Sequence, residues 1–131
     1  MLSTMNEKQE TRIRNMVRIL IIDDDPQILD ILGQTLEREG YEVVDAPNGK
    51  EGLKLYRENP TDLIMPEKEG IETIIELRRD FPDVKIIAIS GGGQIDAEQY
   101  LSMAQKFGVQ KTFAKPIVRA ELVKVVRELL K

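Results

Sequence analysis

The chain of 131 residues contains no cysteine and no histidine. The first absence excludes disulfides and thiol catalysis, and the two together exclude a zinc site of the usual kind. Without histidine, the chain also lacks a histidine general base. The oxygen ligands that remain are hard ligands, and these suit Mg²⁺ or Ca²⁺.

The chain also lacks an excess of positive charge, because its formal net charge is −4. Its composition therefore gives no sign of binding to nucleic acid or to an anionic membrane. Residues 1–16 are polar and contain no apolar run, so we expect no signal peptide, no membrane span and a cytoplasmic protein. We expect these residues to form a flexible N-terminal arm and residues 17–131 to form one domain.

The most informative stretch is residues 19–25, where four branched apolar residues run into three aspartates. A continuous apolar run of this kind predicts a strand that is buried on both faces of a parallel sheet. Asp25 followed by Pro26 is typical of a helix start with Asp25 as its N-cap. Asp23 and Asp24 are then free to face a site at the carboxyl end of the strand. The alternative is that all three acids form a solvated turn.

Segments with strand and helix patterns alternate along the rest of the chain. Apolar runs predict strands at residues 41–46, 84–89 and 109–114, and apolar spacings of three and four residues predict five helices. The helices are expected from residue 26 to before Gly40, at about 50–57, from 71 to about 81, at about 96–107 and through 118–129. This order predicts an α/β fold, a doubly wound parallel sheet with right-handed crossovers and helices on both faces. The chain ends with the last predicted helix, which favours a stand-alone domain.

Polar residues follow the carboxyl ends of the predicted strands. Asp23 and Asp24 follow the first strand, Ser90 ends another, and Lys115 follows the last. Asp62 lies between the second and third predicted helices, in the pattern D-x-x-M-P. Carboxylates within about 6 Å of each other repel by roughly 3 kcal/mol, and a divalent cation such as Mg²⁺ relieves this repulsion. A lysine and a hydroxyl nearby would complete a site for a tetrahedral anion such as a phosphoryl group.

With these motifs the chain resembles a response-regulator receiver domain, the phosphoacceptor module of two-component signalling. The resemblance covers about residues 17–131 and rests on the I-I-D-D-D-P strand end, D-x-x-M-P followed by Gly70, I-S-G at Ser90, and Lys115 followed by Pro116. It implies a flavodoxin-like fold with strand order 2-1-3-4-5. It also implies a histidine kinase or phosphotransfer protein as phosphoryl donor, and a downstream protein that binds the face formed by the fourth helix, fifth strand and fifth helix. We expect a monomer or weak dimer, and no enzyme activity beyond self-catalysed phosphorylation and dephosphorylation.

The resemblance assigns a role to each candidate site residue. Asp62 would be the phosphoacceptor, Ser90 would bond to a phosphoryl oxygen, and Lys115 would pair with another. Lys115 would be held by a cis peptide bond to Pro116.

A Mg²⁺ ion would bind at the same place. Asp24 would be a direct ligand, and Asp23 would help through water or by orienting the site. Asp62 and the main-chain carbonyl of Ile64 would complete the ligand set.

Two departures from the family pattern stand out. Thr112 occupies the place where the family often has a switch tyrosine or phenylalanine, and Phe113, one residue later, would face the opposite side of its strand. The second departure is that the central strand looks truncated. The chain offers only Asn59, Pro60 and Thr61 for a strand before Asp62, whereas a strand crossing a sheet needs about five residues.

This shortening leaves two interpretations open. Either Asp62 is the acceptor and the strand before it is missing, or residues 61–64 begin the strand and the acceptor is among the missing residues. We favour the first, because the D-x-x-M-P spacing is intact. A deletion, a gap in the recorded sequence and a different local fold would each explain the shortening.

The leading functional hypothesis is a stand-alone, reversibly phosphorylated receiver. The alternative is a receiver-like interaction module that is not phosphorylated because its acceptor region is shortened. Two further classes fit less well. A flavin-binding protein of the same architecture would not place three aspartates where a phosphate binds, and a phosphohydrolase with an aspartyl nucleophile would need a cap segment.

Overall fold

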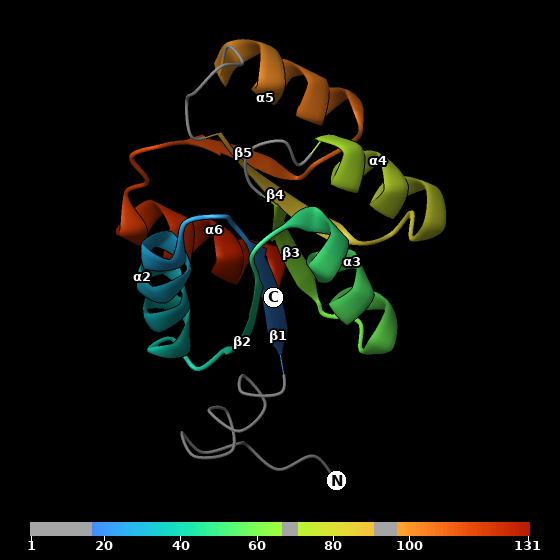
Figure 1. Cartoon of the computed structure of the whole chain (residues 1–131). Coiled ribbons are helices and arrows are strands. Elements are labelled where there is room, and N and C mark those ends of the chain that lie inside the picture. The colour runs from blue at the N-terminus through green and yellow to red at the C-terminus, as the bar shows by residue number, and fades with distance from the viewer. Residues whose placement is uncertain (1–16, 67–70, 91–96) are drawn as a thin grey trace, which may run out of the picture.

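The computed structural model describes residues 17–66, 71–90 and 97–131, which form one parallel sheet with helices on both faces (Figure 1). The strands are β1 (Arg18–Ile22), β2 (Glu42–Ala46), β3 (Leu63–Pro66), β4 (Lys85–Ser90) and β5 (Lys111–Ala114). The helices are α2 (Pro26–Glu37), α3 (Gly49–Glu58), α4 (Ile71–Asp80), α5 (Ala97–Lys106) and α6 (Arg119–Leu129). All strands pair in parallel, in the order β2-β1-β3-β4-β5. The predicted α/β fold and its strand order are therefore confirmed, whereas the predicted N-terminal arm, residues 1–16, lies outside the described residues.

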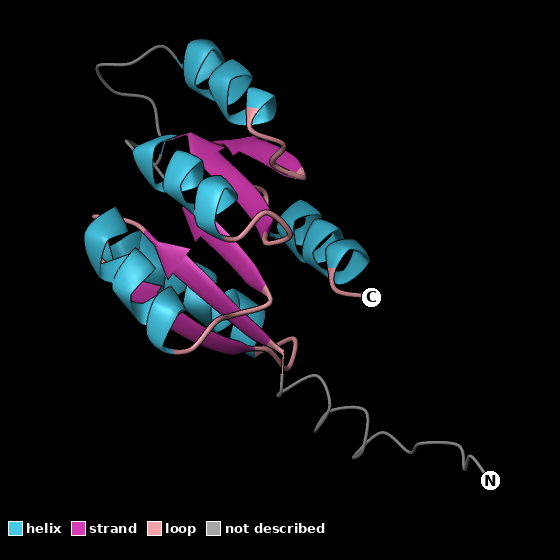
Figure 2. Ribbon diagram, turned by 90° about the vertical axis from the view of Figure 1, so that its right-hand side faces the viewer, coloured by secondary structure: helices cyan, strands magenta, loops and turns pink. Residues whose placement is uncertain are grey.

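Helices lie on both faces of the sheet (Figure 2), and one apolar cluster fills the space on each face. Along β1, Ile19 and Ile21 pack into the cluster that includes α2 and α6, whereas Leu20 and Ile22 pack into the cluster that includes α3 and α4. This division follows from the alternation of side chains along a strand. Because both faces are covered, β1 is apolar at every position after Arg18.

The central strand β3 is the element in which the structure differs most from our expectation. It begins directly after Asp62 and consists of Leu63–Pro66, residues that our favoured interpretation placed beyond the end of this strand, whereas the alternative began the strand at residues 61–64. All four residues are buried, since the position is flanked by strands and covered on both faces. Pro66 is tolerated because it stands at the end of the strand, where the missing N–H costs little.

β3 is short, and its pairing with its two neighbours is unequal. Four residue pairs join it to β1, from Leu63 beside Ile19 to Pro66 beside Ile22. In this described part of the sheet, two residue pairs, Leu63 with Lys85 and Ile64 with Ile86, join it to β4. The third strand, which we predicted to be truncated, is thus four residues long.

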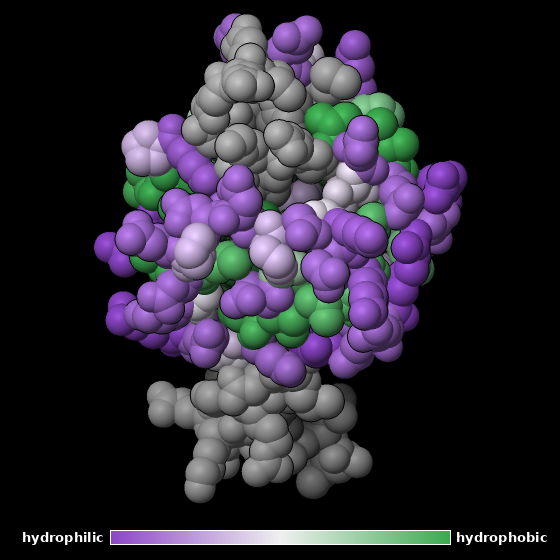
Figure 3. All heavy atoms as spheres, viewed as in Figure 1, coloured by the Kyte–Doolittle hydropathy of each residue, from purple (hydrophilic) through white to green (hydrophobic). Residues whose placement is uncertain are grey.

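The helix boundaries follow local capping signals. The Asp25 carboxylate accepts a hydrogen bond from the N–H of Gln27 at 2.9 Å, so the predicted N-cap of α2 is confirmed. Gly40, with φ of 95°, lies in the turn after α2, where a left-handed conformation favours glycine. Within the described residues, no helix is both long and apolar enough to cross a membrane. The face of the molecule in Figure 3 is mainly hydrophilic, with smaller apolar areas between the charged side chains.

Candidate functional site

The carboxyl edge of the sheet brings Asp23 and Lys115 into contact. Asp23 follows β1 and Lys115 follows β5, although two strands lie between them in the sheet. The Lys115 Nζ lies 3.1 Å from Asp23 Oδ2. The side chains are 21% and 1% exposed respectively, so this is an almost buried ion pair. Removal of either partner would leave a poorly compensated charge or cavity at this edge.

Asp23 is also held by backbone groups. Its Oδ1 accepts a hydrogen bond from the N–H of Asp25 at 2.8 Å, and its own N–H donates to the carbonyl of Ala46 at 3.1 Å. The first contact is the turn that an aspartate makes with the N–H two residues on, so Asp23 itself is the sequence signal for it. These contacts fix Asp23 between β1, β2 and the start of α2. Asp24, beside it, is exposed.

Ser90 reaches the same edge of the sheet. It is the last residue of β4 and pairs with Ala114, the residue before Lys115. The Lys115–Pro116 peptide bond is cis, as the resemblance implies. The structure therefore brings the backbone of Ser90 close to the residues that present Lys115.

Asp62 lies at the opposite, amino edge of the sheet. Its N–H donates to the carbonyl of Arg18, and its Oδ2 accepts from the N–H of Arg18, both at 2.8 Å. Arg18 begins β1 and Asp23 follows its end, so about 16 Å of strand separates the two edges. Our expectation that Asp62 follows the central strand and faces Asp24 is therefore wrong. The D-x-x-M-P segment forms the strand instead of following it.

The predicted set of four Mg²⁺ ligands does not assemble. Ile64 is fully buried in the middle of β3, paired with Leu20, and is not at the carboxyl edge. In the ranges that the structure describes, no group of three or more acidic side chains is placed to hold one metal ion. Asp23 and Asp24 remain, and Asp23 is already paired with Lys115. Since Mg²⁺ often binds through one or two carboxylates and several waters, this pair suits a weak Mg²⁺ site only.

The sequence supplies no aspartate directly after β3. The next aspartate after Asp62 is Asp80, which is the last residue of α4. Asp80 forms ion pairs with Arg57 at 3.0 Å and Arg79 at 2.9 Å. The hydrogen bond from Arg79 lowers the pKa of Asp80 most, and the hydrogen bond from Arg57 lowers it further. Neither aspartate therefore stands beside Asp23 at the carboxyl edge.

The match to known sequences agrees with this fold. A family described as the response regulator receiver domain matches residues 19–127. The chain belongs to this receiver domain family. The geometry above is thus that of a receiver domain whose central strand is short.

Curated relatives are about one third identical to this receiver domain over the aligned residues. Transcriptional regulatory protein GlrR of Escherichia coli K12 is 32% identical over 118 residues, covering 86% of this chain and 26% of that protein. Transcriptional regulatory protein PrrA of Mycobacterium bovis is 33% identical over 119 residues, covering 87% of this chain and 50% of that protein. The chain thus spans between about a quarter and a half of these relatives.

Solved receiver domains have the same fold. A CheY-like receiver domain protein from Methanospirillum hungatei JF-1 superimposes with a TM-score of 0.75 at 30% identity, covering 86% of this chain and 91% of that one. A receiver domain protein from Clostridium thermocellum gives a TM-score of 0.78 at 26% identity, covering 86% and 93%.

The last strand of this receiver domain places Thr112 and Phe113 on opposite faces, as expected from the sequence. Phe113 packs into the apolar cluster that includes α2 and α6. Thr112 pairs with Ala88 and is half-buried. The aromatic ring of Phe113 is therefore part of the core.

Proposed function

We propose that this receiver domain relays a signal in the cytoplasm by protein–protein contact and does not accept a phosphoryl group on Asp62. The register of β3 is the observation that supports this proposal, because it puts Asp62 beside Arg18 and about 16 Å from the Asp23 edge. Transfer of a phosphoryl group needs the acceptor next to the cations that offset its charge. Asp62 is next to neither the Asp23–Asp24 pair nor Lys115.

The carboxyl edge then has a structural role. Lys115 is paired with Asp23, and this contact ties the end of β5 to the end of β1 across two strands. We propose that a histidine kinase or phosphotransfer protein still docks at this edge, without transfer to Asp62. The proposed surface for a downstream partner is formed by α5, β5 and α6. Because GlrR and PrrA are transcriptional regulatory proteins, we place the signal in transcriptional control.

Aspartyl phosphate labelling tests the proposal. The intact mass of the protein is first compared with 14.9 kDa, because a larger mass would show that residues are missing from the sequence, and folding is checked by circular dichroism. It is then incubated with acetyl phosphate and Mg²⁺, trapped with borohydride, and mapped by mass spectrometry.

We expect no label on Asp62, and none on Asp23 or Asp24, under conditions that label the receiver domain of PrrA as a positive control. Label on Asp62 that disappears in Asp62→Asn would overturn the proposal. Label on Asp23 or Asp24 would also overturn it, since the carboxyl edge would then be an acceptor.

A further inference from the structure

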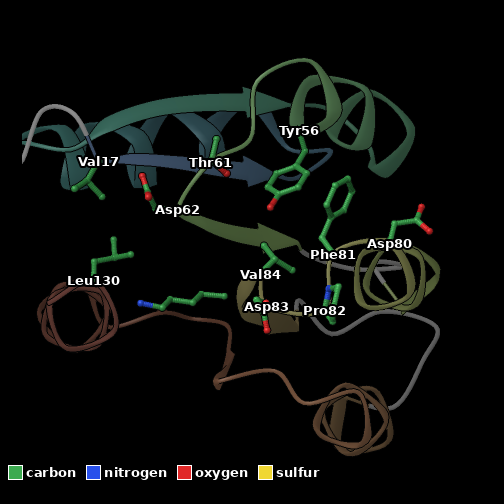
Figure 4. A pocket seen from close by; sticks show the side chains of 11 residues that line it. Val17, Tyr56, Thr61, Asp62, Asp80, Phe81, Pro82, Asp83, Val84 and Leu130 are labelled. Carbon is green, nitrogen blue, oxygen red and sulfur yellow. The ribbon is translucent and has the colours of Figure 1, made fainter.

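A pocket of about 510 Å³ lies at the amino edge of the sheet, away from Asp23 (Figure 4). Its volume is within the range of small-molecule sites. Tyr56 from α3, Phe81 after α4 and Val84 before β4 supply apolar walls, and Asp62 lies at its side. The pocket thus combines aromatic and acidic groups.

The hydroxyl of Tyr56 is an open hydrogen-bonding position inside this pocket. Tyr56 is only 6% exposed, and Figure 4 shows its hydroxyl pointing into the pocket. The ring packs edge-on against Phe81, with 4.8 Å between centroids, but the hydroxyl makes no hydrogen bond with any residue that the structure describes. Among the described residues, the hydroxyl is not a fully buried atom left without a partner, so water reaches it, and a ligand group would replace that water.

Two of the charged residues around the pocket are already satisfied. Asp80 is paired with Arg57 and Arg79, and lies beyond Phe81 in Figure 4. The Nζ of Lys85, which also lines the pocket, donates to the main-chain carbonyl of Leu129. Among the described residues, Lys85 forms no ion pair with Asp62 or Asp83.

Asp62 and Asp83 supply the negative charge that is left. Asp62 uses Oδ2 for the N–H of Arg18, and among the described residues neither carboxylate forms an ion pair. Asp83 acts on the guanidinium of Arg78 only at longer range. Burial raises the pKa of Tyr56, and the charge of Asp62 raises it further, so the field of this carboxylate reaches the hydroxyl.

We propose that this pocket binds a small organic cation, an ammonium group carried on an apolar aromatic body. The ammonium would donate to the Asp62 carboxylate and to the Tyr56 hydroxyl oxygen, while the body packs against the apolar wall formed by Tyr56, Phe81 and Val84. An ammonium near aromatic faces gains further attraction from their quadrupoles. The inference stands apart from the proposed function, because the pocket lies at the other edge of the sheet from Asp23.

The probe for this site is 2-phenylethylammonium, with uncharged 2-phenylethanol as its matched control. Amide shifts of Thr61, Asp62 and Val84 are followed by NMR during each titration. We expect saturable binding of the ammonium with a Kd of about 1 mM, typical of a ligand of this size. The alcohol should bind at least about tenfold more weakly, because it cannot compensate the carboxylates.

Variants assign the binding to the proposed groups. Asp62→Asn keeps an acceptor for the N–H of Arg18 but removes the charge, and should weaken ammonium binding about tenfold. Tyr56→Phe keeps the ring against Phe81 and should weaken it about threefold to fivefold. Asp45→Asn, at an exposed acid on β2, makes the same change in net charge and should leave the Kd unchanged within about twofold.

Three results would each overturn the proposal: absence of saturable shifts, equal binding of ammonium and alcohol, or an equal loss in Asp45→Asn and Asp62→Asn. If Asp62→Asn proves unfolded by circular dichroism, the Kd of the ammonium for Tyr56→Phe becomes the test. An unchanged Kd in Tyr56→Phe would overturn the proposed contact with the hydroxyl.

Discussion

We expect Arg78→Met to lower the free energy of unfolding by about 3 kcal/mol. Arg78 lies on α4, and its guanidinium donates five hydrogen bonds that join α4 to the segments before β4 and β5. The acceptors are the carbonyls of Phe107 at 2.8 Å, Pro82 at 3.1 Å, Val84 at 2.5 Å and Gly108 at 2.8 Å, and the side-chain oxygen of Gln110 at 3.3 Å. A single side chain thus organises two loops.

The magnitude follows from which acceptors are shielded from water. The contacts to Phe107 and Val84 are partly buried, and each carbonyl left without a donor costs about 1–3 kcal/mol. The other three contacts are exposed, so water can replace the guanidinium there at small cost. Burial lowers the pKa of Arg78, which shows that holding this cation costs some stability, so we take a value near the lower part of the summed range.

Urea unfolding followed by circular dichroism measures the effect. Arg79→Met is the matched control, because Arg79 is the next residue, its side chain is 66% exposed, and its ion pair with Asp80 is a surface pair. We expect Arg79→Met to cost much less stability than Arg78→Met. The loss of stability in Arg78→Lys should lie between the losses in these two variants. An ammonium keeps the charge but cannot donate to the acceptors before β4 and before β5 at the same time. A loss of less than about 0.5 kcal/mol in Arg78→Met, or equal losses in Arg78→Met and Arg79→Met, would refute this reasoning.

Three further changes test the core and the carboxyl edge. Gly52→Ala would place its Cβ 2.3 Å from Cδ1 of Ile22. Despite the gain in helix propensity, we expect this clash to lower the free energy of unfolding by about 1–2 kcal/mol in urea unfolding. An unchanged free energy of unfolding would show that Ile22 on β1 shifts at little cost. Lys115→Met would leave the buried Asp23 carboxylate without its cation and should cost about 3 kcal/mol, much of it recovered in the double variant with Asp23→Asn; additive losses would contradict the ion pair. Asp24→Asn should abolish most of the weak Mg²⁺ binding in an NMR titration, and an unchanged titration would remove Asp24 from the site.

Most of the fold could be predicted because the periodic signals are strong. The apolar run of β1 and the cap at Asp25 led to the correct strand and helix start, and the helix predicted at residues 50–57 is α3, Gly49–Glu58. At the carboxyl edge, the meeting of Asp23 with Lys115 followed from the rule that parallel strands end together.

The central strand could not be predicted in the same way. Four residues, Leu63–Pro66, are too few to show a period, and their match to a known motif suggested a loop instead. These residues form a strand because they pair with β1 on one side and with β4 on the other. This pairing depends on the assembled sheet and not on the local sequence. The roles of Arg78 and Tyr56 depend on contacts between distant segments, and their own neighbours in sequence carry no signal of them.

The unequal pairing of β3 has a consequence for how the domain opens. Five residue pairs join β1 to β2 and four join β1 to β3, but two join β3 to β4, so the backbone ladder is weakest along the middle of the sheet. Across this line the two halves are held mainly by side-chain packing, because both apolar clusters contain residues of β3 and of β4. Apolar packing weakens on cooling, whereas a full ladder would hold the strands together by hydrogen bonds. Amide exchange of β4 and β5 should therefore diverge from that of β1 and β2 as the temperature falls, and the two halves of the sheet should behave as separate cold-sensitive units.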